Sequence, residues 1–335
     1  MTIKILTHQR INELLNNWEI GKVKSINKVK NAGIVNHNWI IKTSFKKYVL
    51  RKTSQFKKEN DIKFELKYLS YLKDKKIRYQ IPTPIKTKNG NLLIKTGEGN
   101  FWLYEFIPGK QVDNYNEDKL KKVTRMLVTY HQILKKSDLD NRSKLSPMNK
   151  ANVLEELKKF RKSTFLKKSK DVKDKLLLKQ SSILLPILKG IDTINYAKLK
   201  KYPIHRDLNA DNILWNKNNL TGIIDFDNVS NTKEPLLKDI AIILQFLCVD
   251  KNYRLIVSKA RIVINEYTKY LPLPKEEISL IPDILTVAFI EDYSYAFWML
   301  LNDPNRAKIR WLNENYNAAI WHHENNEKLS KELLK

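Results

Sequence analysis

One segment limits the possible folds and functions of this chain more than any other. It reads His-Arg-Asp-Leu-Asn-Ala-Asp-Asn over residues 205–212, and Asp-Phe-Asp follows at residues 225–227. Between them, two short apolar runs flank four turn-forming residues at positions 216–219. Apolar runs separated by such a turn predict a β-hairpin. A hairpin here would bring Asn212 beside Asp225.

The residue types and their spacing point to phosphoryl transfer. In the catalytic loop of protein kinases, His-Arg-Asp-x-x-x-x-Asn, the Asp accepts the proton of the attacking hydroxyl, and the Asn and a second Asp bind magnesium. By this pattern Asp207 is the candidate base, and Asn212 and Asp225 are the candidate Mg²⁺ ligands. Each half of the pattern also arises by chance as turn or cap residues. The strand, turn and strand between the two halves favour the kinase-like interpretation.

Length and cysteine content predict a globular protein of two lobes. A chain of 335 residues exceeds the roughly 100–200 residues of a single domain and can bury a large core. The single cysteine, Cys248, excludes an internal disulfide framework and is expected to be buried and inert. The first residues have no apolar stretch of signal-peptide length, and no apolar run approaches about 18 residues. We therefore expect a cytoplasmic protein without a membrane partner.

The net charge of +26, from 62 Lys and Arg against 36 Asp and Glu, raises the question of nucleic-acid binding. The lysines are spread along the chain, and no run reaches the five or six like charges of a basic tail. A solvated surface therefore explains the charge better than a specific nucleic-acid site. An anionic substrate, or loose association with polyanions, stays open.

Periodicity predicts an α+β chain with two lobes. Residues 22–107 contain mainly β-rich segments and one helix at 56–73, which predicts a five-stranded antiparallel sheet with an inserted helix. Asn89-Gly90 is expected to turn a hairpin between residues 85–86 and 91–95. We expect residues 1–106 to form a nucleotide-binding lobe and residues 107–335 a helical lobe with the catalytic loop and substrate site. Its expected helices are 120–135, 153–160, 172–185, 236–249, 255–270, 284–301 and 305–328.

A kinase also needs a basic residue on its third strand and an acidic partner on the following helix. Arg51 ends the strand Tyr48-Val49-Leu50-Arg51 and is the candidate residue to bind the nucleotide phosphates. Lys52 competes for this role, but the two-residue period of a strand puts it on the opposite face. Glu65 is the favoured helix partner and Glu59 the alternative.

The expected phosphate-covering loop is residues 31–38, with Gly33 and Asn36 as candidate contacts. It contains one glycine, so it can bring few backbone amides close to phosphate. The backbone at Glu105 and Ile107 falls at the expected junction of the lobes, where it could bind an adenine edge while Ile107 and Leu214 enclose the ring.

Together these segments resemble the aminoglycoside phosphotransferase superfamily of kinase-like small-molecule kinases, which includes type II homoserine kinase, choline kinase and spore-coat kinase-like proteins. The resemblance covers most of the chain and implies a protein kinase-like two-lobed fold, ATP and Mg²⁺ as cofactors, and a small-molecule alcohol as acceptor. It also implies that Asp207 is the base, Asn212 and Asp225 the metal ligands, and Asp239 a structural residue. The matching segments are residues 33–39, 48–51, 65–72, 103–109, 205–215, 223–227 and 239–241.

The acceptor is less constrained than the chemistry. No Ala-Pro-Glu follows Asp-Phe-Asp, so the activation segment of protein kinases is missing. Candidate substrate contacts are Asp227 and, in an aromatic and acidic stretch, Glu291, Asp292 and Trp298, which suit a cationic amine. His322 and the adjacent His323 are interpreted as surface residues, since they diverge by about a hundred degrees on a helix.

Two other functions remain as alternatives: a kinase-like nucleotide-binding structural protein without turnover, and a nucleic-acid-binding protein driven by charge. The acceptor, the choice of ATP or GTP, and the oligomeric state stay open.

Overall fold

The chain forms two compact units in a computed structural model that describes residues 6–29, 36–139, 147–230, 233–302 and 309–335. The first unit joins Met1–Gln111 to Asp211–Ser230, and the second joins Val112–Ala210 to Asn231–Lys335.

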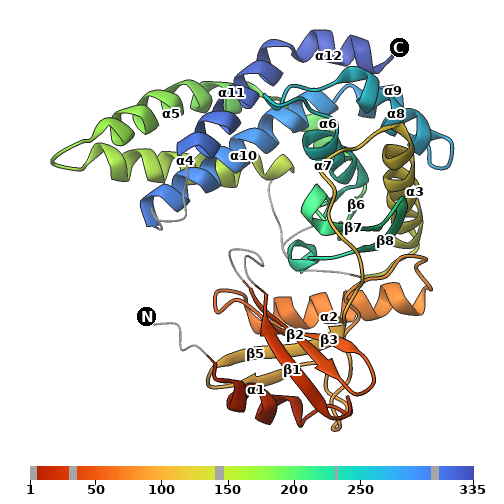
Figure 1. The fold of residues 1–335 in the computed structure, drawn as a ribbon. Coiled ribbons are helices and arrows are strands. Elements are labelled where there is room, and N and C mark those ends of the chain that lie inside the picture. The colour runs from red at the N-terminus through yellow and green to blue at the C-terminus, as the bar shows by residue number, and fades with distance from the viewer. Residues whose placement is uncertain (1–5, 30–35, 140–146, 231–232, 303–308) are drawn as a thin grey trace. The chain divides into compact units, whose positions relative to one another are not determined.

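The first unit is built on the predicted five-stranded antiparallel sheet, with strand order β1-β2-β3-β5-β4. Alternate residues of the central strands bury apolar side chains on one face, where Ile41, Leu50 and Leu103 share a core. Figure 1 shows α1 and α2 on opposite sides of this sheet. The elements are α1 (His8–Leu15), β1 (Val23–Lys28), β2 (His37–Thr43), β3 (Lys47–Lys52), α2 (Glu59–Asp74), β4 (Ile94–Thr96) and β5 (Gly99–Glu105).

Two features of this unit differ from the sequence predictions. Helix α1 was not predicted; it buries Ile11, Leu14 and Leu15 in the sheet core. The predicted hairpin around Asn89-Gly90 is wrong. A turn does form there, but Ile85 N–H bonds to Leu103 O at 2.8 Å, and residues 94–96 pair with β5 instead. The hairpin is therefore β4–β5, in which Thr96 pairs with Gly99 next to the turn, while residues 84–85 pair with β5 further along the same edge.

The predicted catalytic hairpin is confirmed. Strands β7 (Ile213–Asn216) and β8 (Asn219–Ile223) pair antiparallel in the first unit. Lys110 and Trp215 exchange backbone hydrogen bonds of 2.8 and 2.9 Å, which ties the hairpin to the segment after β5. Gly109 and Gly222 permit this close approach, since a Cβ on Gly109 would lie 2.8 Å from the Leu214 side chain and one on Gly222 would lie 2.7 Å from Gln80 O.

The second unit is mainly helical, which confirms the α+β prediction. Its long helix α10 buries most of its length and packs along α11. The elements are α3 (Glu117–Lys135), α4 (Lys150–Phe165), α5 (Val172–Gly190), α6 (Ile194–Lys198), β6 (Lys201–Tyr202), β9 (Glu234–Pro235), α7 (Leu236–Leu247), α8 (Val257–Thr268), α9 (Lys275–Ile278), α10 (Ile281–Asn302), α11 (Ile309–Glu324) and α12 (Asn326–Leu333).

Among the described residues, the segment Lys275–Asn302 is long and apolar enough to cross a membrane by length and composition. Its most apolar window is 72% buried inside the protein, which is typical of a core helix. The apolar composition of α10 is thus explained by packing.

Candidate active site

A buried polar cluster surrounds Arg51 in the first unit. Arg51 Nη2 donates to Asp225 Oδ1 at 2.9 Å and lies 3.3 Å from Asp227 Oδ2. Arg51 Nη1 lies 3.6 Å from Glu65 Oε1 on α2. Strand β3 aims this guanidinium because Arg51 faces away from the core residue Leu50 before it. Lys52, the competing candidate, is outside this cluster and lies beside Gly99.

Lys57 completes the cluster and was missed by the sequence analysis. Its ammonium donates to Glu65 Oε2 at 2.5 Å and to Asp227 Oδ1 at 3.1 Å. It sits just before α2, and its side chain is 11% exposed. Nothing in a sequence rich in Lys-Lys pairs distinguishes this lysine, because the tertiary packing of the segment before α2 alone turns it inward.

The charges of this cluster act strongly on one another. Burial raises the pKa of Glu65 to about 7, against the opposing charges of Lys57 and Arg51. Burial also disfavours ionisation of Asp227, yet the charges of Arg51 and Lys57 hold the pKa of Asp227 well below its usual range. Two cations thus meet three carboxylates, those of Glu65, Asp225 and Asp227. The carboxylate oxygens of Asp225 and Asp227 suit a cationic ligand such as a metal ion.

The hairpin brings the two predicted metal ligands to its open end. Ile224 N–H bonds to Asn212 O at 2.9 Å, so Asn212 lies beside the residue that precedes Asp225. Asp225 has a φ of 63°, a left-handed conformation that Asn and Asp tolerate better than most residues. One amide and one carboxylate are a fitting protein contribution to Mg²⁺, which usually binds one or two carboxylates together with phosphates and water. Among the described residues, no group of three or more His, Cys, Asp or Glu could hold a metal alone.

The remaining nucleotide candidates differ in their surroundings. Asn36 Nδ2 donates to Asp227 Oδ2, and Asn36 Oδ1 accepts from Ser54 N–H at 3.0 Å. Gly33 lies outside the described residues. Ile107 is buried against Gly222 of the hairpin. The Glu105 side chain is exposed and pairs with Lys46 at 2.7 Å, so only its backbone suits the predicted role.

The catalytic-loop segment of the second unit is held by Asp239, near the start of α7. Its Oδ1 accepts from Arg206 N–H at 2.8 Å and its Oδ2 from His205 N–H at 3.2 Å. His131 lies 3.4 Å from the same Oδ2. Arg206 has a φ of 62°, which is costly for a long side chain. The carboxylate therefore stabilises a strained turn, and Asp207 follows it with Oδ1 accepting from Asn209 Nδ2 at 2.7 Å.

Helix α10 carries the predicted substrate residues of this unit. Glu291 Oε1 accepts from Asn149 Nδ2 at 2.7 Å and lies 3.6 Å from Arg206 Nη2. Asp292 Oδ2 accepts from Gln245 Nε2 at 2.8 Å. Burial, with the negative charge of Glu291, raises the pKa of Asp292 to about 7.

Trp298 and His322 differ from these carboxylates in their surroundings. Trp298 is 40% exposed and stacks on Tyr295 at 5.9 Å. The interpretation of His322 as a surface residue is wrong. It is fully buried, stacks on Phe289 at 5.0 Å, and its Nε2 lies 3.1 Å from Tyr253 O. Its neighbour His323 is exposed, as predicted.

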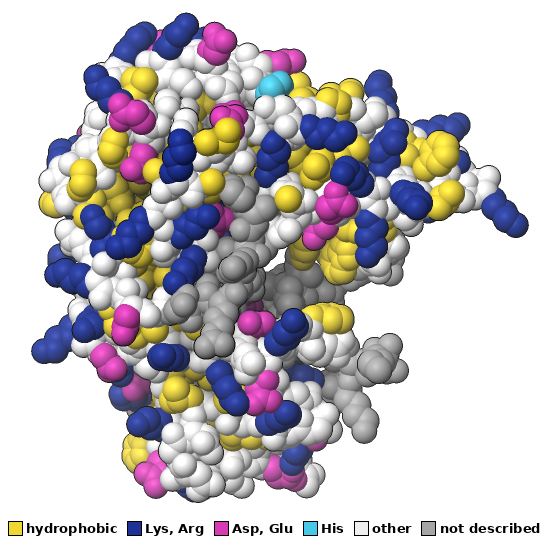
Figure 2. All heavy atoms as spheres, turned by 180° about the vertical axis from the view of Figure 1, so that it is seen from behind, with side chains coloured by type: hydrophobic (Ala, Val, Ile, Leu, Met, Phe, Trp, Pro, Cys, Tyr) yellow, Lys and Arg dark blue, Asp and Glu magenta, His cyan; other side chains and the backbone are white. Residues whose placement is uncertain are grey.

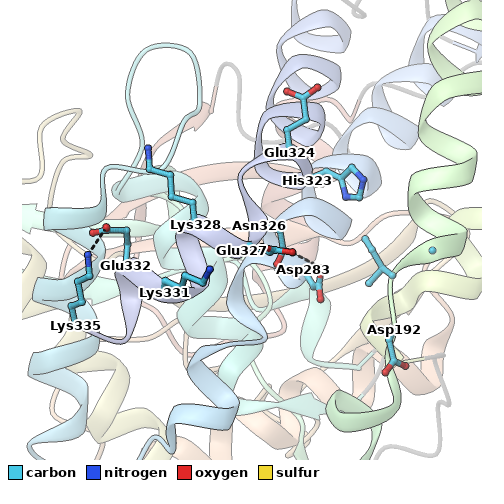
Figure 3. A pocket seen from close by; sticks show the side chains of 12 residues that line it. Asp192, Asp283, His323, Glu324, Asn326, Glu327, Lys328, Lys331, Glu332 and Lys335 are labelled. Atoms are coloured by element: carbon cyan, nitrogen blue, oxygen red, sulfur yellow. Dashed lines mark hydrogen bonds and ion pairs between the residues drawn. The ribbon is translucent and has the colours of Figure 1, made fainter.

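A separate hollow of about 870 Å³ lies between α12 and the end of α5 (Figure 3). No predicted site residue lines it. Two contacts among its lining residues are local: Asn326 Nδ2 donates to Asp283 Oδ1 at 2.6 Å, and Lys335 pairs with Glu332 at 2.7 Å. Basic side chains elsewhere are scattered and interspersed with acidic ones over the face in Figure 2, and no single basic patch stands out there.

Comparison with known proteins assigns the chain to a family. The sequence profile of the phosphotransferase enzyme family matches residues 28–273, a span that contains the Arg51 cluster and the catalytic-loop segment. The chain belongs to the phosphotransferase enzyme family. This phosphotransferase is therefore a kinase-type enzyme, as the resemblance predicted.

Relatives and solved structures agree with this assignment. The phosphotransferase is 23% identical to homoserine kinase of Parvibaculum lavamentivorans over 305 residues, covering 90% of this chain and 89% of that protein. It is 23% identical to homoserine kinase of Agrobacterium fabrum, covering 83% and 81%. The structure of spectinomycin phosphotransferase with ADP and spectinomycin superposes with a TM-score of 0.70 at 17% identity, covering 97% and 100%. This likeness confirms the kinase-like two-lobed fold.

Proposed function

We propose that this phosphotransferase transfers the γ-phosphoryl group of ATP to a hydroxyl of a small metabolite, a homoserine-, choline- or sugar-like alcohol. The observation that carries the proposal is the hairpin β7–β8, whose pairing joins Asn212 to the residue before Asp225. Two metal ligands at one end of a hairpin fit a nucleotide-bound Mg²⁺, which would neutralise charge on the phosphates when bound.

Each polar group of the site has a role in this proposal. Asp207 accepts the proton of the acceptor hydroxyl, and the hydrogen bond from Asn209 orients its carboxylate. Arg51, held by the carboxylates of Glu65 and Asp225, binds phosphate oxygens of the nucleotide. Positioning and fixed charge supply most of the rate enhancement, because phosphoryl transfer asks little covalent chemistry of the protein.

The relatives support a small acceptor. Homoserine kinases align over most of this chain, and a choline kinase is among the proteins of similar fold. The binding of ADP or an ATP analogue by structural neighbours supports a nucleotide at the Arg51 cluster.

The test is magnesium-dependent ADP release from ATP with a panel of homoserine, choline, sugars, aminoglycosides and a generic protein. We expect stimulation by one small alcohol, with Asp207→Asn and Asp225→Ala each lowering kcat at least ~10³-fold, as for groups that act only in the transition state. Asp211→Asn is the matched control, since this exposed carboxylate lies on the same loop and should leave kcat unchanged. Full turnover in Asp225→Ala would contradict the metal assignment. ATP binding without turnover for any acceptor would favour the nucleotide-binding structural protein.

A further inference from the structure

Two buried cations in the second unit lack the hydrogen bonds that such groups normally form. Lys238, in the first turn of α7, is 3% exposed, and its ammonium has no hydrogen-bond partner among the described residues. The side chain of Arg206 is 9% exposed, and its Nε–H likewise has no partner in that part of the chain.

Glu291 lies near both cations but satisfies neither. Its Oε2 is 3.8 Å from Lys238 Nζ and its Oε1 is 3.6 Å from Arg206 Nη2, both too long for hydrogen bonds. Oε1 already accepts from Asn149 Nδ2 at 2.7 Å.

A buried cation is costly unless it is both paired and hydrogen-bonded. The buried carboxylate of Glu234 also faces the charges of both cations, but its described hydrogen bond is from Tyr196 Oη at 2.7 Å. Lys238 Nζ and Arg206 Nε therefore have no hydrogen-bond partner among the described residues and are free to donate to an oxyanion.

Both donors are linked to the turn that carries the proposed base. Arg206 immediately precedes Asp207 in the turn held by Asp239. Lys238 immediately precedes Asp239 in α7, and the Asp239 carboxylate accepts from the backbone N–H of Arg206, so both cations adjoin the contact that holds this turn. An oxyanion bound by the pair would thus sit within reach of the group that is to deprotonate the acceptor.

We infer that Lys238 and Arg206 form a subsite for the carboxylate of the phosphoryl acceptor, so that the substrate is a hydroxy acid or a hydroxylated amino acid. The inference rests on the proposed function and narrows its acceptor class. Carboxylates and phosphates are both oxyanions that suit such donors. The position beside Asp207 favours the acceptor over the nucleotide as the source of the oxyanion.

The test compares acids with their uncharged amides as acceptors: L-homoserine with L-homoserinamide, and glycerate with its amide. We expect kcat/KM to favour the better acid about 10- to 100-fold, the range of one or two charge-assisted hydrogen bonds. Lys238→Met should reduce this ratio at least about tenfold by raising KM for the acid. It should leave kcat/KM for the amide and KM for ATP unchanged. Lys251→Met, which removes an exposed charge, should keep the wild-type ratio.

Three results would overturn the inference: equal use of acid and amide by the wild type, a rise in KM for ATP in Lys238→Met, or failure of every acid to react or to bind by calorimetry. The first and third need no variant, so misfolding of Lys238→Met cannot mask them. Phosphorylation of an alcohol that lacks a carboxylate, with no acid used, would reject the subsite and leave the proposed phosphoryl transfer standing. Absence of turnover with every alcohol would count against the proposed function itself.

Discussion

The carboxylate of Asp239 accepts a hydrogen bond from the backbone N–H of Arg206 at 2.8 Å, across 33 residues of sequence. The same carboxylate accepts from His205 N–H, so the left-handed turn before Asp207 is held from α7. The position of the proposed base therefore depends on a residue that has no part in the chemistry.

Asp239→Asn tests this support. An amide oxygen can accept from one backbone N–H well, but the amide nitrogen then faces the other donor, which is left buried and unsatisfied. We expect the free energy of unfolding in urea to fall by about 2–3 kcal/mol and kcat to fall with it. Asp250→Asn is the matched control: its carboxylate also accepts from two backbone N–H groups, at 2.8 and 2.9 Å, but in an exposed turn. A loss of stability as small as that of the control would show that Asp239 does not hold the turn.

Lys57→Met tests the buried cluster of the first unit. The change leaves the fully buried Glu65 carboxylate with Arg51 at 3.6 Å as its remaining described ion pair. Breaking one partner of a buried pair typically costs about 3–5 kcal/mol, and we expect a loss of that order in urea unfolding. Lys95→Met removes an exposed lysine that pairs with Glu59 at 2.8 Å and should produce no measurable change. Equal stability of the two variants would contradict the assigned importance of Lys57.

Asp292 should make the protein less stable as pH rises toward neutrality. Its folded-state pKa of about 7 lies above the usual 3.8, so the folded protein binds more protons than the unfolded chain between these values. Stability contributed by the protonated form is therefore lost as pH rises through 7. Relative to Asp292→Asn, we expect the wild type to lose roughly 2 kcal/mol between pH 5 and pH 8. Because Glu65 titrates in both proteins, its contribution cancels in the difference. Parallel stability curves for the two proteins would contradict the prediction.

His322 should act in the opposite sense. Burial lowers the pKa of His322 to about 4 from the usual 6.5, so the unfolded chain binds the extra proton between these values. Stability should then fall by about 2–3 kcal/mol as pH drops from 7 to 4. His322→Phe should keep the stacking on Phe289 and lose less unfolding free energy than the wild type as pH falls from 7 to 4. His323→Phe, at an exposed position, should lose as much as the wild type. If His322→Phe and the wild type lost the same unfolding free energy between pH 7 and pH 4, His322 would not be a buried neutral histidine.

Local pattern was enough to predict much of the fold. The two-residue alternation of β3 and β5 and the turn residues at 216–219 are short-range signals. Both strands and the hairpin formed, with two residues, Lys217 and Asn218, between β7 and β8. Helical periods likewise located α3, α5, α7, α8 and α10. The motif residues Asp207, Asn212 and Asp225 could be chosen from sequence because the hairpin that spaces them is itself local.

Contacts between distant segments decided the rest. No periodicity distinguishes Lys57 from its neighbour Lys58, yet packing turns Lys57 onto Glu65 and Asp227. Nor does any motif show that Lys238 would be buried without a hydrogen bond, or that His322 would stack on Phe289. The sequence by itself determined the elements and the types of reacting group, because those follow from near neighbours along the chain. Only the tertiary structure decided which charges lose their water, since desolvation and ion pairing depend on residues far apart in sequence.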